Sequence, residues 1–125
     1  MNKTILVVED YDDIRSMMRI LLEVHGYKVF EASDGYEAVQ MARQHRPDMI
    51  LLDLAMPVMD GLEAAREIRS HDYLANTPIV AVTAYGDLYR DQALSAGCNE
   101  VVAKPLDFES LGPLVEKYIG GLETI

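Results

Sequence analysis

The sequence predicts an α/β fold in which helices cover both faces of a parallel sheet. Short apolar runs of strand length alternate with amphipathic helical segments along all 125 residues. The runs Met49 to Leu52 and Ile79 to Val82 are continuously apolar, as expected for strands buried on both faces. Helices on both faces and right-handed crossovers predict a doubly wound strand order such as 2-1-3-4-5.

The first half of the chain contains two predicted strand and helix units. Ile5 to Val8 is a strand, and Asp12 to Val24 is a helix whose acidic first turn suits the positive end of the helix dipole. A strand at Val29 to Ala32 follows, and Asp34 with Gly35 then opens a second helix. The apolar residues at helical spacing are Ile14, Met17, Met18, Leu21 and Leu22 in the first helix and Ala38, Val39, Met41 and Ala42 in the second, and we expect the methionines to fill the core.

The second half contains three further units. The predicted segments are strands at Met49 to Leu52, Ile79 to Val82 and Val101 to Ala103, and helices from Gly61 to about Arg69, from about Asp87 to Ala96, and from Asp107 to near Gly120. Pro113 interrupts the last helix, where an internal proline costs about 3 kcal/mol. The helix therefore either kinks or is preceded by a short turn and begins at Pro113, and we favour the second arrangement.

Length and composition predict one domain over residues 1–125, with a core of about 3–119 and a short C-terminal tail. The net charge of −10 opposes direct binding to nucleic acid. Cys98 is the only cysteine, which excludes an internal disulfide, and we expect a buried, inert thiol. No stretch has the pattern of a signal peptide or a membrane span, so we expect a cytoplasmic protein without a membrane partner.

Four predicted strands end in polar residues of complementary chemistry. Glu9 and Asp10 follow the first strand, and Asp53, Thr83 and Lys104 follow three others. Because parallel strands share their carboxyl edge, these side chains are expected to converge there. Alone, each has an ordinary interpretation as a helix cap, a turn residue or a surface lysine, but their joint placement favours a site.

The acidic residues of this site require a compensating cation. Two carboxylates a few ångströms apart repel by about 4 kcal/mol at an effective dielectric of 20. Oxygen ligands without clustered Cys or His favour Mg²⁺. An Asp carboxylate can act as a nucleophile that forms an acyl phosphate, and Asp53 is our candidate. Lys104 and Thr83 would then contact phosphoryl oxygens.

The chain closely resembles the receiver domain of two-component response regulators, of the chemotaxis-regulator type, over roughly Lys3 to Ile119. The resemblance rests on Ile5-Leu6-Val7-Val8-Glu9-Asp10, Asp53-Leu54-Ala55-Met56-Pro57-Val58-Met59-Asp60-Gly61, Val82-Thr83-Ala84 and Lys104-Pro105. It implies a (βα)5 flavodoxin-like three-layer sandwich.

The resemblance also implies roles for individual residues. Asp53 would be the phosphoacceptor, and Asp10, Asp53 and the Ala55 carbonyl would bind Mg²⁺, with Glu9 acting through water. Lys104 would contact the phosphoryl group, with a cis peptide bond to Pro105. Thr83 would be the switch hydroxyl.

The resemblance implies partners as well. A sensor histidine kinase or histidine phosphotransfer protein would donate the phosphoryl group, and a downstream effector protein or output domain would respond. The domain would catalyse only its own phosphorylation and dephosphorylation, and phosphorylation-dependent dimerisation is one outcome of the family. The chain would be either a stand-alone regulator or one domain of a larger protein.

Two features qualify the resemblance. Val101 occupies the position three residues before Lys104 where the family uses an aromatic ring in its switch, so the output step is expected to differ. By the same resemblance, Tyr85 and Ala55 occupy positions that in the family border the water approaching the acyl phosphate, and they would tune its lifetime.

Three alternatives remain open at this stage. Val101 and the irregular last helix motivate a phosphorylation-independent protein-binding module on the same fold. A Mg²⁺-dependent phosphatase with an aspartyl-phosphate intermediate is less favoured, because Ala55 stands where such an enzyme needs a second acid. A flavin site is weakest, because the first strand ends in acids instead of a phosphate-binding loop.

Overall fold

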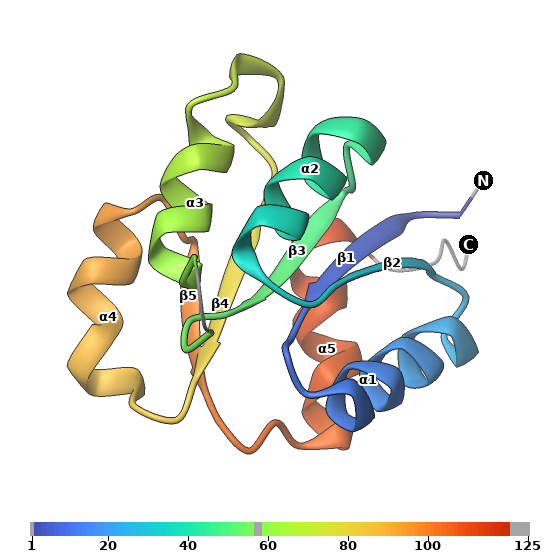
Figure 1. The fold of residues 1–125 in the computed structure, drawn as a ribbon. Helices are drawn as coiled ribbons and strands as arrows, with labels where there is room; N and C mark the ends of the chain where they lie inside the picture. The colour runs from blue at the N-terminus through green and yellow to red at the C-terminus, as the bar shows by residue number, and fades with distance from the viewer. Residues whose placement is uncertain (1, 57–58, 121–125) are drawn as a thin grey trace.

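The computed structural model describes residues 2–56 and 59–120, and within them five strands alternate with five helices (Figure 1). The elements are β1 (Thr4–Val8), α1 (Asp12–Val24), β2 (Lys28–Ala32), α2 (Gly35–His45), β3 (Met49–Asp53), α3 (Gly61–Arg69), β4 (Ile79–Thr83), α4 (Gly86–Ser95), β5 (Glu100–Ala103) and α5 (Phe108–Ile119). A short 3-10 turn at Asp72–Leu74, which the sequence analysis did not predict, precedes β4. All strand pairs are parallel, in the order β2-β1-β3-β4-β5. The predicted doubly wound fold is confirmed.

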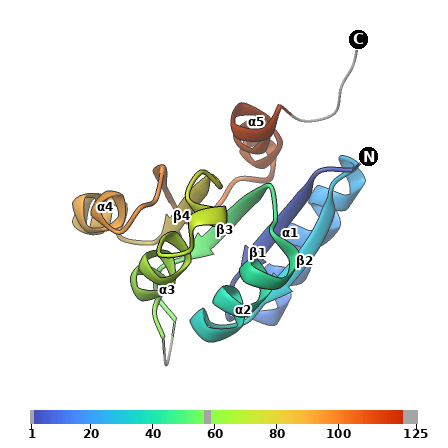
Figure 2. The same ribbon diagram turned by 90° about the horizontal axis from the view of Figure 1, so that it is seen from above.

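The helices form two layers around the sheet (Figure 2). Helices α1 and α5 cover one face, and α2, α3 and α4 cover the other. Successive strand residues therefore enter different cores: Leu6 and Ile50 pack on the side of α2 and α3, whereas Ile5 and Leu51 pack on the side of α1 and α5. This two-sided burial explains why the strands are continuously apolar.

Local hydrogen bonds start the helices next to the sheet edge. The Asp34 side chain accepts a hydrogen bond from the Glu37 N–H at 2.8 Å and so caps α2. Asp60 caps α3 in the same way through the Glu63 N–H at 2.9 Å. These caps fix where α2 and α3 begin.

The structure corrects the prediction for the last helix. Helix α5 is continuous from Phe108 to Ile119 and passes through Pro113, instead of beginning there. A proline disfavours the helical conformation of the residue before it, in part because its ring clashes with the Cβ of that residue. Gly112 has no Cβ, so this clash is absent before Pro113. Leu111 and Val115 are fully buried against the sheet and hold the helix on both sides of the proline.

The expectation that the methionines fill the core is wrong for Met17. Met17 and Ile14 on α1 are 46% and 42% exposed, whereas Met18 and Leu22 are buried. The apolar face of α1 is thus wider than the strip that the sheet covers.

Two parts of the predicted pattern lie outside the described residues. They are Pro57 and Val58 of the motif after β3, and the tail Gly121 to Ile125. Over residues 2–56 and 59–120, none of the helices has both the length and the apolar character needed to span a bilayer.

Candidate functional site

The polar residues at the strand ends converge at one edge of the sheet, as the sequence analysis predicted. Asp53 and Thr83 are the last residues of the neighbouring strands β3 and β4, and Lys104 directly follows β5. The Lys104 N–H donates to the Thr83 carbonyl at 2.9 Å, which aligns β5 with β4 at this edge. Glu9 and Asp10 follow β1, which lies on the other side of β3.

Glu9, Asp10 and Asp53 form a compact acidic cluster. Each contributes one carboxylate oxygen to a group in which all the oxygens lie within 4.8 Å of one another. Glu9 and Asp53 are each only 3% exposed. Among the described residues, the buried Asp10 Oδ1 has no hydrogen-bond partner. A buried carboxylate oxygen without a partner is costly, so the cluster is chemically incomplete.

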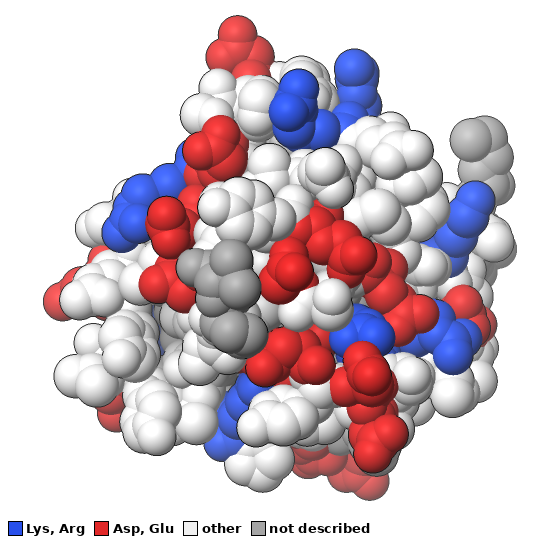
Figure 3. Space-filling model, viewed as in Figure 1, with Lys and Arg blue, Asp and Glu red and all other residues white. Residues whose placement is uncertain are grey.

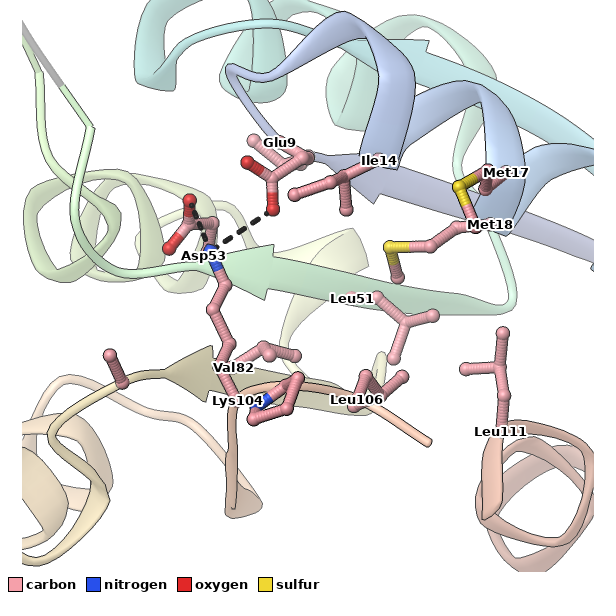
Figure 4. Close-up of a pocket in the computed structure, with 13 residues that line it drawn as sticks. Glu9, Ile14, Met17, Met18, Leu51, Asp53, Val82, Lys104, Leu106 and Leu111 are labelled. Carbon is pink, nitrogen blue, oxygen red and sulfur yellow. Dashed lines mark ion pairs between the residues drawn. The ribbon is translucent and has the colours of Figure 1, made fainter. Parts of the chain in front are cut away.

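Lys104 supplies a positive charge inside the cluster (Figure 4). Its Nζ lies 3.2 Å from Glu9 Oε1 and 3.2 Å from Asp53 Oδ2. The Lys104–Pro105 peptide bond is cis, as the resemblance implied. One ammonium beside three carboxylates leaves the cluster with excess negative charge.

The pKa values of Asp53 and Glu9 reflect mainly their burial. Burial raises the pKa of both Asp53 and Glu9, and the Lys104 ammonium offsets only part of the effect. Burial lowers the pKa of Lys104, but the charges of Asp53 and Glu9 outweigh it, so the net pKa is raised. The raised pKa values show that burial disfavours the charged form of these two carboxylates and that their charges favour the ammonium form of Lys104.

Two close approaches of the backbone surround Asp53 at the end of β3. Its Oδ1 accepts a hydrogen bond from the Ala55 N–H at 3.1 Å. At the start of α3, a Cβ added to Gly61 would lie 2.4 Å from the Asp53 carbonyl oxygen, so only glycine allows this close approach.

Thr83 is buried at the end of β4 and is 1% exposed. Its Oγ1 accepts a hydrogen bond from the Tyr85 N–H at 3.1 Å. A hollow of about 200 Å³ brings Thr83 together with Ala55, Tyr85 and Tyr89. Val101, at the expected aromatic position, is 7% exposed and belongs to the core beneath α3 and α4.

A larger cavity of about 400 Å³ opens beside Lys104. Ile14 and Met17 from α1 and Leu106 from the loop after β5 line it (Figure 4). Glu9 and Asp53 line it as well. Ile14 and Met17 were predicted to lie on a helix but not at the site. The sequence pattern that could have placed them there is the apolar face of α1, which is wider than packing against the sheet requires.

The surface agrees with the net charge of −10. Figure 3 shows Asp and Glu side chains gathered between the start of α2 and the start of α1, with Lys and Arg interspersed. Cys98 lies outside this region, next to Arg69, and is 5% exposed. Burial raises the pKa of its thiol to about 11, in agreement with the expected inert cysteine.

Comparisons with known proteins agree on one family. The chain matches the model of the response regulator receiver domain over residues 5–116. It is 33% identical over 123 residues to the polar-differentiation response regulator DivK of Brucella anthropi, covering 96% of this chain and 98% of that protein.

Solved structures give the same result. The receiver domain of a sensor histidine kinase from Pseudomonas aeruginosa superposes with a TM-score of 0.88 at 36% identity, covering 97% of this chain and all of that one, and that structure has a magnesium ion coordinated in its active site cleft. The chemotaxis response regulator CheY4 of Vibrio cholerae superposes with a TM-score of 0.89 at 30% identity, covering 94% and 99% of the two chains.

Proposed function

The chain belongs to the response regulator receiver family of two-component systems, and from this premise we propose that it is a switch controlled by phosphorylation of Asp53. The observation that carries the proposal is the buried pair of Asp53 and Glu9 with Lys104 between them. A buried carboxylate held beside an ammonium at the carboxyl edge of a parallel sheet suits nucleophilic attack on a phosphoryl group.

The donor set fits Mg²⁺. The oxygens of Glu9, Asp10 and Asp53 are close enough to share one ion, and Asp10 Oδ1 is a buried acceptor without a protein partner among the described residues. We propose Asp10 and Asp53 as carboxylate ligands, the Ala55 carbonyl as a further ligand, and Glu9 as a residue that acts through water. When bound, Mg²⁺ supplies positive charge to a phosphoryl oxygen.

In the transfer step, an Asp53 carboxylate oxygen attacks phosphorus. An O–P bond to Asp53 forms as the bond from phosphorus to the donor breaks, and the electron pair of that bond leaves with the donor. Lys104 now contacts Asp53 Oδ2 at 3.2 Å, and it would move to a phosphoryl oxygen. The Thr83 hydroxyl would donate a hydrogen bond to another phosphoryl oxygen. In the present structure this hydroxyl accepts a hydrogen bond from the Tyr85 N–H.

The cavity beside Lys104 supports a protein as donor. A histidine kinase or phosphotransfer protein must bring a phosphohistidine to Asp53, and the exposed Ile14 and Met17 provide apolar contact area at that approach. We propose that an effector protein or output domain then reads the phosphorylated state. The domain would catalyse only its own phosphorylation and dephosphorylation.

One observation favours a second candidate. Val101 is buried and has no ring that could turn between two positions. A protein that binds partners without phosphorylation would need no such movement. The two candidates differ in whether phosphorylation changes partner affinity.

The test is phosphorylation of the purified protein by acetyl phosphate, with and without Mg²⁺, followed by intact mass. We expect one Mg²⁺-dependent, hydroxylamine-labile phosphoryl adduct on the wild type and none on Asp53→Asn. The matched control is Asp72→Asn, the same substitution at an exposed residue of the 3-10 turn, which should leave the adduct unchanged. A wild type that takes no adduct would refute the proposal and favour the phosphorylation-independent binding module.

A further inference from the structure

We propose that Arg15 is a positioning residue that holds the Glu9 and Asp10 turn in place for Mg²⁺. The inference rests on the proposed Mg²⁺ site. Arg15 Nη1 donates to the Glu9 carbonyl oxygen at 2.9 Å. The Arg15 side chain is only 16% exposed, so this hydrogen bond is largely shielded from solvent.

The guanidinium is held in turn by two acids. Arg15 Nε lies 3.1 Å from Glu31 Oε1 on β2, and Nη2 lies 2.7 Å from Asp12 Oδ1. Asp12 is 83% exposed and adds little, whereas Glu31 is 33% exposed and belongs to a strand. Three nitrogens on one planar group therefore connect three parts of the chain, which a lysine ammonium cannot do in the same geometry.

These contacts attach both polar groups of the Glu9 main chain to β2. The Glu9 N–H donates to the Ala32 carbonyl at 3.1 Å. The Glu9 carbonyl is connected through Arg15 to Glu31, the residue that precedes Ala32 on the same strand. The turn that carries two of the acidic residues is thus fixed against the edge of the sheet.

The acidic cluster needs this restraint. Glu9, Asp10 and Asp53 repel one another, and Asp10 Oδ1 lacks a protein partner among the described residues, so electrostatics favours a turn displaced outward. A cation site requires its oxygens at fixed separations before the ion arrives. Groups that orient ligands in this way typically change metal affinity by about 10- to 100-fold when they are removed.

The charge of Arg15 makes the test sharp, because charge and position predict opposite signs. Removing a cation near a Mg²⁺ site should tighten Mg²⁺ binding by electrostatics alone. Removing a group that positions the ligands should weaken it. A loss of affinity on neutralising Arg15 therefore identifies a positioning role.

Arg19 is the matched control. It lies one turn further along α1 and also pairs with Glu31, with Nε 3.0 Å from Glu31 Oε2, and with Glu23 at 3.0 Å. Arg19 thus pairs with Glu31 and Glu23, whereas the hydrogen bond to the Glu9 carbonyl comes from Arg15. Replacing it removes the same charge from the same helix.

The experiment is isothermal titration calorimetry of Mg²⁺ into the full chain, for the wild type and the variants Arg15→Met, Arg15→Lys and Arg19→Met. Methionine keeps the aliphatic stem of arginine and removes its donors. We expect Arg15→Met to weaken Mg²⁺ binding by about tenfold and Arg15→Lys by about threefold. Arg19→Met should bind Mg²⁺ as the wild type does, or slightly more tightly. Thermal unfolding of each variant checks that it is folded, and Arg15→Lys keeps the test valid if Arg15→Met does not fold.

The outcomes separate this inference from the proposed function. Unchanged or tighter Mg²⁺ binding by the folded Arg15 variants would overturn the inference, as would an equal loss in Arg19→Met. In that case the acetyl phosphate adduct on wild-type Asp53 would still support the proposed function. A wild type that neither binds Mg²⁺ nor takes the adduct would overturn both.

Discussion

Single atoms decide how close the elements at the site approach one another. The start of α3 lies so near the end of β3 that a Cβ at Gly61 would be 2.4 Å from the Asp53 carbonyl oxygen. Lys104 Nζ at 3.2 Å from two buried carboxylates depends on the same strand ends staying in register. A shift of a few tenths of an ångström at these strand ends or at the start of α3 would therefore change the surroundings of Asp53, the proposed phosphoacceptor.

We predict that Gly61→Ala destabilises the fold by about 1–3 kcal/mol, because the added methyl group must displace backbone and not a flexible side chain. The free energy of unfolding in urea measures the effect. Arg66→Ala, at an exposed position of the same helix, should change it by less than about 0.5 kcal/mol. Equal stabilities of Gly61→Ala and the wild type would mean that the close approach is not maintained in solution.

At the scale of elements, α1 and α5 have different tasks on the same face of the sheet. Helix α5 passes through Pro113 because Leu111 and Val115 are buried on either side of it. Helix α1 buries Met18 and Leu22 but leaves Ile14 and Met17 at the cavity beside the site. One helix thus contributes mainly to stability, and the other combines stability with a binding surface.

Replacing the proline in α5 should stabilise the protein. Pro113→Ala restores an N–H that can donate to the carbonyl four residues earlier and removes the steric conflict, with an expected gain of about 1–3 kcal/mol. Pro113 is exposed, so little packing is lost. Urea unfolding measures the gain, and a lower stability than the wild type would contradict this account of α5.

Helix α1 yields a functional prediction. The assay uses a histidine phosphotransfer protein that phosphorylates the wild type. Ile14→Lys should slow phosphoryl transfer from this protein by about tenfold or more, because a charge replaces apolar contact area. Phosphorylation by acetyl phosphate should be unchanged, since a small donor needs no docking surface. Ile20→Lys, an exposed position of α1 that does not line the cavity, is the control. An equal loss with both donors would show that Ile14 acts on the chemistry instead.

For the molecule as a whole, the acidic cluster links metal binding to stability. A ligand that binds only the folded state stabilises it in proportion to the logarithm of its concentration. The same carboxylates repel one another when no cation is bound. Without a bound cation, the acidic cluster therefore lowers the stability of the folded protein.

Asp10→Asn should separate the two effects. Without metal, the variant should unfold at a temperature about 4 °C higher than the wild type, which corresponds to about 1 kcal/mol of relieved repulsion. Addition of Mg²⁺ should raise the unfolding temperature of the wild type and not that of the variant. Differential scanning calorimetry with Asp72→Asn as the control measures both. A variant less stable than the wild type without metal would mean that the Asp10 carboxylate is not under strain from its neighbours.

The order of strands and helices, the helix starts at Asp34 and Asp60, and the residues at the strand ends could all be predicted from the sequence. These features follow from local periodicity, capping chemistry and the shared carboxyl edge of parallel strands. Three features became visible only in the folded chain: α5 continues through Pro113, Ile14 and Met17 face a cavity, and Arg15 connects the Glu9 main chain to β2. Each of these depends on contacts between segments distant in the chain, and a local pattern carries no information about which neighbour a side chain meets.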